Sequence, residues 1–138
     1  MATLKIDEAI YVRLANYAGL TALTSTRIHK AVAVENATFP RVTYTFIYAT
    51  PNHAMTGDVT TVSELLRVDV WADTYTSMTD VAAQVKSALR DYSGTITSGA
   101  DDLAIDWIYY DTEYDVVGMD AEKRTEVYHR VLDFIVWY

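Results

Sequence analysis

The stretch RTEVYHRVLDFIVWY, which spans Arg124 to Tyr138, decides the fold that we expect for this chain. It contains no Gly, Pro or Asn, and its β-branched and aromatic residues favour an extended strand. At about 3.3 Å per residue such a strand would span roughly 50 Å, whereas a compact chain of this length has a radius of gyration of only about 14 Å. We therefore expect the strand to be bent or bulged, or to project in a hairpin that contacts neighbouring molecules.

Two helices are predicted upstream from apolar residues that recur every three or four positions. The first is expected near residues 4–18, with Gly19 as its C-terminal cap. The second is expected to begin at Ser77, because Asp80 follows three positions later as in a capping box. The apolar stripes are Ile6, Ile10, Leu14 and Tyr17 in the first helix and Met78, Val81, Val85, Ala88 and Tyr92 in the second.

The remaining apolar segments predict strands that are joined in part by two polar loops. The strands are expected at Arg27–Val34, Arg41–Ala49, Ser63–Asp73, Leu103–Tyr114 and Glu126–Tyr138. The loops are expected at Thr50–Val62 and Asp115–Lys123. This order predicts an α+β fold, in which an antiparallel or mixed β-sheet with long hairpins packs two α-helices on one face.

Length and composition predict one folded domain over residues 1–138 and argue against several classes of function. The sequence has no linker, repeat or low-complexity tract, and its 138 residues can bury a core without disulfides. There is no Cys for thiolate chemistry, and no apolar run approaches the roughly 20 residues of a membrane span. The net charge of −8 argues against binding to nucleic-acid phosphates, although a wall that repels phosphate would let DNA slide past.

Both sides of the predicted strands carry large apolar side chains mixed with charges. In the strand Arg67–Asp73 one side shows Val68 and Val70, and the other side shows Asp69 and Trp71. The last strand alternates in the same way. Two interpretations stay open: a sheet face that forms a subunit interface, or a central strand that is buried on both sides.

No arrangement of residues indicates catalysis, a metal site or a cofactor. The three His residues are far apart and match no metal-ligand spacing, and the isolated glycines form no phosphate-binding or nucleophile motif. Carboxylates are abundant, but Arg67 or Arg130 could neutralise one of them as a simple ion pair across the sheet. We therefore predict that the protein is not an enzyme and uses no cofactor.

In the order and spacing of its segments the chain resembles the tail terminator, or tail completion, proteins of long-tailed bacteriophages and related phage-like particles. The resemblance covers nearly the whole chain. After the first helix it rests on LTAL at 20–23 with Arg27-Ile28, FPRVTY at 39–44, RVDVWA at 67–72, the helix Tyr75–Leu89 and RVLDFIVWY at 130–138. One departure is His29-Lys30, where relatives often have an aromatic residue followed by Pro.

The resemblance implies a virion structural protein at the head–tail junction. Such proteins form a ring, usually hexameric, that caps the tail tube, ends tube elongation and joins the tail to the head connector. DNA passes through the lumen without sequence-specific binding. The expected partners are thus other copies of the chain, the tail tube protein and a head completion or connector protein, with no membrane. The expected location is the tail or neck of the virion, after assembly in the host bacterial cytoplasm.

Two alternatives stay open beside this interpretation. One is another neck or tail component of similar fold, and the other is a small soluble α+β enzyme or ligand-binding domain that uses the carboxylate-rich sheet. For the leading interpretation, the position of the two polar loops between strands places the contacts with neighbouring subunits or rings there. The predicted interface residues are Asn52, His53, Met55, Thr56, Asp58, Val117, Met119 and Asp120.

Overall fold

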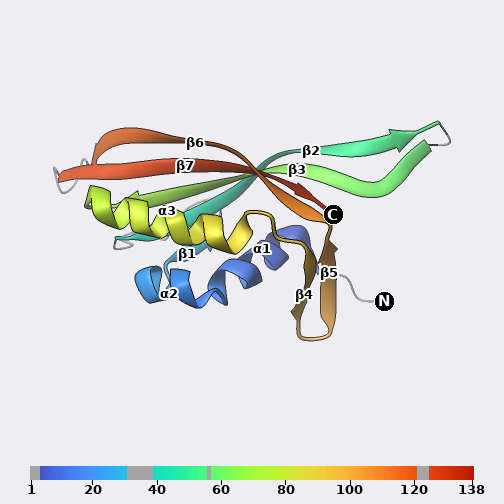
Figure 1. Cartoon of the computed structure of the whole chain (residues 1–138), viewed down its shortest axis with the longest axis horizontal. Coiled ribbons are helices and arrows are strands. Elements are labelled where there is room, and N and C mark those ends of the chain that lie inside the picture. The colour runs from blue at the N-terminus through green and yellow to red at the C-terminus, as the bar shows by residue number, and fades with distance from the viewer. Residues whose placement is uncertain (1–3, 31–38, 56, 121–124) are drawn as a thin grey trace.

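The computed structural model describes residues 4–30, 39–55, 57–120 and 125–138 (Figure 1). Its elements follow in the order α1 (Ile6–Ala15), α2 (Ala18–Thr24), β1 (Ile28–Lys30), β2 (Arg41–Ala54), β3 (Gly57–Ala72), α3 (Tyr75–Leu89), β4 (Gly94–Ser98), β5 (Asp101–Ile105), β6 (Trp107–Asp120) and β7 (Thr125–Trp137).

The main sheet has five strands in the order β1-β2-β3-β7-β6. Strands β1 and β2 are parallel, and the other neighbours are antiparallel. The three helices of the described part of the chain lie together on one side of this sheet (Figure 1). The predicted α+β class, with its long hairpins and helices on one face, is therefore confirmed, with one helix more than expected.

Strand β7 lies inside the sheet between β3 and β6, where its many apolar side chains are removed from water. Its residues Leu132, Phe134 and Val136 are fully buried against the helices. The chain end belongs to the sheet as well, because Tyr138 and Val62 exchange backbone hydrogen bonds of 2.9 and 2.7 Å. The closing residues therefore stabilise the core, and the projecting part of this strand is its hairpin end (Figure 1).

The predicted first helix is in fact two helices. Helix α1 ends at Ala15, and α2 begins at Ala18 and contains Gly19, which is therefore not a C-terminal cap. The Gly19 backbone lies against the end of the flexible Gln84 side chain of α3, which would have to move to make room for a side chain at this position.

Helix α3 spans Tyr75–Leu89, the bounds quoted for the family resemblance, and so begins before the Ser77 capping box. Its N-cap is Thr74, whose hydroxyl accepts a hydrogen bond of 3.1 Å from the backbone N–H of Ser77, so the capping box expected at Ser77 is wrong. The apolar stripe was predicted correctly, since Met78, Val81, Val85 and Ala88 are all buried, whereas Tyr92 lies beyond the helix and is half-buried.

The two predicted polar loops are wrong in their described parts, which are hairpin strands, and residues 56 and 121–123 lie outside the described residues. Strand β2 continues to Ala54 and pairs with β3 from Gly57, and β6 continues to Asp120 and pairs with β7 from Thr125. Bulges interrupt both hairpins, at Phe46/Tyr48 in β2 and at Tyr110/Thr112 in β6. The two hairpins leave the body at opposite ends (Figure 1).

The predicted strand Leu103–Tyr114 is also two elements. It breaks at Asp106, whose backbone N–H donates to the carbonyl of Trp137 at 2.8 Å. Before this break β5 pairs with β4 in a separate two-stranded sheet, which was not predicted, and after it β6 joins the main sheet. The predicted strand Arg27–Val34 is confirmed at 28–30, and residues 31–34 lie outside the described residues.

Candidate functional site

One face of the main sheet is covered by no helix in the described part of the chain, and we call it the open face (Figure 1). Alternate residues of β3, from Leu65 to Trp71, lie on this face, and the strand register places their partners in the neighbouring strands on the same face. Its members are Arg41, Thr43, Thr45 and Tyr48 in β2, Leu65, Arg67, Asp69 and Trp71 in β3, His129, Val131, Asp133, Ile135 and Trp137 in β7, and Trp107, Tyr109, Thr112, Tyr114 and Val116 in β6. The sequence left open whether the last strand is a central strand buried on both sides or part of a subunit interface. In the structure β7 is a central strand, but helices cover only one of its sides (Figure 1).

The charges at the centre of the open face neutralise one another. The guanidinium of Arg67 donates to both carboxylate oxygens of Asp133, at 2.9 and 3.2 Å. Asp133 is only 7% exposed, and its hydrogen bonds raise the pKa of Arg67. This is the ion pair across the sheet that the sequence suggested. The pair satisfies both charges within the chain, as structural ion pairs do.

A second polar pair lies beside the first. His129 Nε2 is 2.7 Å from a carboxylate oxygen of Asp69, and the imidazole ring stacks on Trp71 at a centroid distance of 3.7 Å. The guanidinium of Arg41 lies 5.6 Å from the centre of the same Trp71 ring. The histidine is thus held by a carboxylate and by a ring, and in the described residues no group of three or more potential ligands could hold a metal ion.

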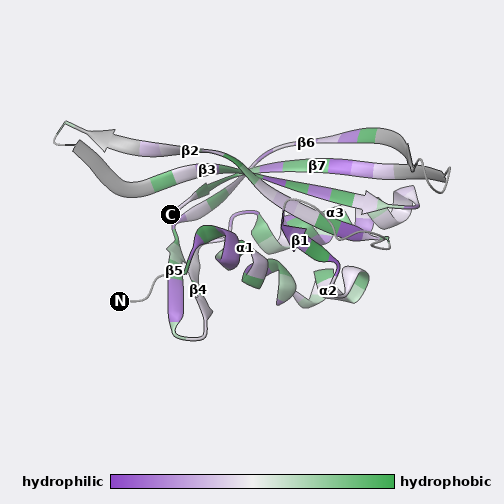
Figure 2. Cartoon of the chain, turned by 180° about the vertical axis from the view of Figure 1, so that it is seen from behind, coloured by the Kyte–Doolittle hydropathy of each residue, from purple (hydrophilic) through white to green (hydrophobic). Residues whose placement is uncertain are grey.

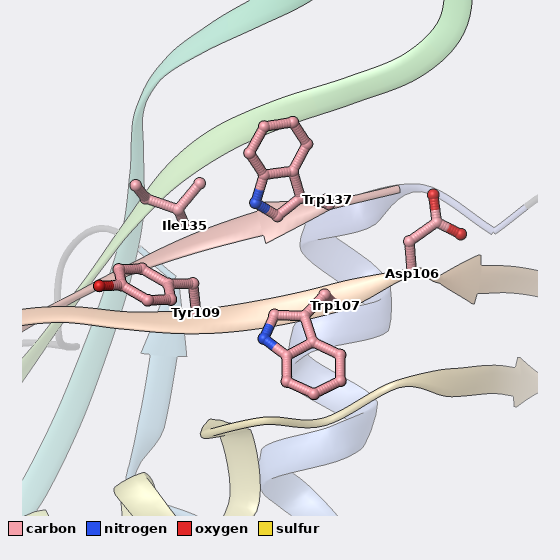
Figure 3. Close-up of a pocket in the computed structure, with 5 residues that line it drawn as sticks. All are labelled: Asp106, Trp107, Tyr109, Ile135 and Trp137. Carbon is pink, nitrogen blue, oxygen red and sulfur yellow. The ribbon is translucent and has the colours of Figure 1, made fainter.

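At the other end of β7 the open face is apolar and exposed. Trp107 and Tyr109 of β6 are 45% and 52% exposed, and with Ile135 and Trp137 of β7 they line a depression of about 550 Å³ (Figure 3). Among the described residues that line it, Asp106 is the one that carries a charge. A catalytic pocket needs several converging polar groups, which this depression lacks, whereas exposed aromatic residues are typical of protein interfaces.

The hydropathy of the strands also supports a protein interface on the open face. Seen from behind, the coloured parts of β3, β6 and β7 alternate between hydrophobic and hydrophilic residues (Figure 2). Sequence reasoning missed the depression, because it forms only where the register sets Trp107 opposite Trp137 and Tyr109 opposite Ile135.

The residues predicted as the interface fall into two separate groups. Met55 is fully exposed at the end of the β2–β3 hairpin, where the backbones of His53 and Asp58 are partners, and Asn52 precedes them in β2. Thr56 lies outside the described residues. The other group, Val117, Met119 and Asp120, lies in the outer part of β6. The structure brings together the members of each group but not the two groups, and the interface role of all these residues stays a prediction.

Ion pairs also fix the part of the β6–β7 hairpin that lies near the body. Arg130 donates to both carboxylate oxygens of Asp115, at 2.6 and 3.2 Å. These bonds hold the pKa of Asp115 below its ordinary value and raise that of Arg130. On the same strand Lys86 of α3 pairs with Glu113 at 3.2 Å. The hairpin is therefore tied to its own strands and to α3 near the body.

None of the helices in the described residues is long and apolar enough to cross a membrane.

Comparisons with known proteins place this architecture in a family. The family model described as Tail completion protein gp17 matches residues 8–138. Among solved structures, a chain of "Virion of native gene transfer agent (GTA) particle" has a similar fold, with a TM-score of 0.72, 17% sequence identity, and coverage of 96% of this chain and 92% of that chain. No curated protein matches. The chain therefore belongs to the family of Tail completion protein gp17, a family of bacteriophage virion structural proteins.

Proposed function

We propose that the protein acts at the head–tail junction as a ring, most simply a hexamer, that caps the tail tube and ends its elongation. The ring joins the tail to a head completion or connector protein. It assembles in the host bacterial cytoplasm and performs no catalysis. Family membership supports the tail role, and the surface of the chain supports the ring.

The observation that carries the proposal is the pair of hairpins that leave the body at opposite ends (Figure 1). The hairpin ends lie beyond the helices, and Met55 at one of them has no contact that would shield it from water. A subunit of a junction ring must touch neighbours in the ring, the tube on one side and the connector on the other. Two arms that point in opposite directions, together with an uncovered sheet face, meet this requirement.

The open face supports protein contacts in particular. Arg67 and Asp133 are paired within the chain, and the Asp69 carboxylate is in hydrogen-bond contact with His129, so a partner that covers these groups finds them already satisfied. Its exposed tryptophan and tyrosine residues are the side chains that dominate the energetics of interfaces.

The charge of the chain supports a passage for DNA. A net charge of −8 per copy would surround a ring lumen with negative charge, so that phosphate is repelled and DNA moves without binding. Reversing acidic residues that face the lumen should slow DNA exit. Unchanged ejection from particles with such variants would argue against this part of the proposal.

Substitution of the aromatic depression tests the proposal. We expect Trp107→Ser with Tyr109→Ser to leave the fold intact, because both side chains are about half exposed, but to reduce capping of purified tail tubes as seen by electron microscopy. Leu23→Ser is the matched control, since Leu23 is also exposed but lies on helix α2, away from the open face. Equal capping by both variants would contradict a role of the open face.

A further inference from the structure

Charge is distributed very unevenly along this chain. Residues 1–41 carry five basic and three acidic residues, a net charge of +2, although the whole chain has a net charge of −8. Residues 91–122 carry nine acidic residues and no basic residue. The first segment contains β1 and reaches the start of β2, and the second contains β6. Because β1 and β6 are the two outer strands of the main sheet, opposite edges of one sheet carry opposite charge.

The edge at β6, which we call the acidic edge, presents carboxylates without partners. Glu113 and Asp115 are paired with Lys86 and Arg130, but in the described residues no cation lies within ion-pair distance of Asp106 or Asp111. Both of these aspartates are exposed. Exposed Tyr109 and Tyr114 lie along the same strand.

The backbone of the acidic edge is open as well. Ile108 exchanges hydrogen bonds with Asp91 and Tyr92 on its outer side, and within the described residues no further outward backbone bond follows along β6. An outer strand with unpaired N–H and C=O groups can take up a strand or loop of another molecule.

The opposite edge, which we call the basic edge, presents two neighbouring guanidinium groups. The parallel register that pairs Ile28 with Val42 places Arg27 beside Arg41, and the Val42 N–H donates to the carbonyl of Arg27 at 2.9 Å. Arg27 Nε donates to the carbonyl of Pro40 at 2.8 Å, and Arg41 lies 4.6 Å from the Phe39 ring centre. Each guanidinium group is thus held by a contact with its own chain, and a guanidinium held in place is well suited to a carboxylate at an interface.

We propose that the acidic edge of one copy docks on the basic edge of the next copy, head to tail. The occupant of each edge is a second copy of this chain, because one chain carries both complementary surfaces and the two lie too far apart to meet within it. Two copies of charge −8 repel each other over most of their surface, so this pairing selects both the contact and its direction. Repeated with a constant rotation, a head-to-tail contact closes a ring. The inference rests on the proposed ring and assigns its subunit interface.

A charge swap tests this interface. In variant X, Asp106→Lys with Asp111→Lys makes both edges basic, and in variant Y, Arg27→Glu with Arg41→Glu makes both edges acidic. We expect each variant alone to form rings at least about tenfold less well than the unmodified protein, measured by native mass spectrometry and electron microscopy. An equimolar mixture of X and Y should restore rings in which the two variants alternate, which requires an even number of subunits.

Controls separate this inference from loss of fold. Asp80→Lys with Asp102→Lys makes the same change of charge at exposed positions on α3 and β5, outside both edges, and we expect it to form rings normally. Circular dichroism checks the fold of each variant. If variant Y does not fold, variant X and the salt dependence of the unmodified ring still test the interface. The unmodified rings should dissociate between about 0.05 and about 0.5 M NaCl, because salt screens the complementary charges.

Normal rings of variant X would overturn the assignment of the interface and leave the ring itself intact. Normal rings of X combined with altered DNA ejection would mean that the acidic residues face the lumen, which also overturns it. If the unmodified protein forms no ring, alone or on tail tubes, the proposed function fails before the interface is tested.

Discussion

Asp133 shows how a buried carboxylate in an apolar strand can have a structural role. It lies in the most apolar strand of the chain, is almost completely buried, and faces the open side of the sheet rather than the helices. The bidentate contact with Arg67 explains its presence, because a carboxylate at this depth needs a cationic partner.

We predict that Asp133→Ala lowers the free energy of unfolding by about 1–3 kcal/mol, because Arg67 then keeps a half-buried charge without a partner. Replacement of both residues, as Arg67→Met with Asp133→Leu, should recover most of this loss. Urea denaturation measures both variants. A value for Asp133→Ala within about 0.5 kcal/mol of the unmodified protein would show that the ion pair contributes little.

The pair of Asp115 and Arg130 gives a prediction about pH. The hydrogen bonds from Arg130 depress the pKa of Asp115 in the folded state. The pair therefore adds stability above the unfolded pKa of about 3.9, and this stability is lost as the pH falls through the folded pKa. We expect Asp115→Asn to lower the urea midpoint at neutral pH and to make no difference near about pH 2. A difference that is the same at both pH values would contradict this mechanism.

Among the elements, strand β7 is the one on which the fold depends most. It pairs with a strand on each side, and its helix-facing side chains are fully buried. We predict that Phe134→Ala costs about 3–5 kcal/mol of unfolding free energy and that deletion of Phe134–Tyr138 prevents folding. The control Tyr109→Ala, at a half-exposed position on neighbouring β6, should cost no more than about 1 kcal/mol. Similar costs for the two substitutions would contradict the central place of β7.

The β2–β3 hairpin is expected to serve assembly and not stability. Beyond Thr50 and Ser63 its strands pair with each other, and Pro51 and Met55, whose burial is described, are both exposed. We predict that replacing Asn52–Asp58 with a short Asn-Gly turn leaves the urea midpoint unchanged and abolishes ring assembly on tail tubes. Normal tails built with this variant would disprove the role of the hairpin end.

These elements show which parts of the fold can be predicted from sequence. Strand β7, the strand segment Arg67–Ala72 and the stripe of α3 were predicted because burial on a helical or strand period leaves a pattern in the residues. The ends of the two hairpins leave no such pattern, since threonine-rich strands such as 57–62 are held by backbone pairing. Gly19 resembled a helix cap because the pattern cannot show that α3 lies against it.

The candidate surface was predicted only in part for a related reason. The sequence indicated that both sides of β7 carry apolar groups, but the depression at Trp107 and Trp137 needs a register between strands that are distant in the chain. The two charged edges could be counted in the sequence. That they lie opposite each other depends on the strand order, which the sequence pattern does not fix.

The whole molecule has one covered and one uncovered sheet face, hairpins at opposite ends, and edges of opposite charge. Each of these features is a disadvantage for an isolated subunit, because exposed aromatic residues and open strand edges promote association. In a closed ring every copy would cover one edge of its neighbour and leave its arms free for the tube and the connector.

Electron microscopy of the purified protein mixed with tail tubes tests most directly whether the protein forms a ring that caps the tube. We expect a ring of six-fold symmetry on one end of each tube, and tubes capped in this way should no longer lengthen when tube protein is added. Tubes that carry no ring at either end, or that continue to grow beneath it, would contradict the account.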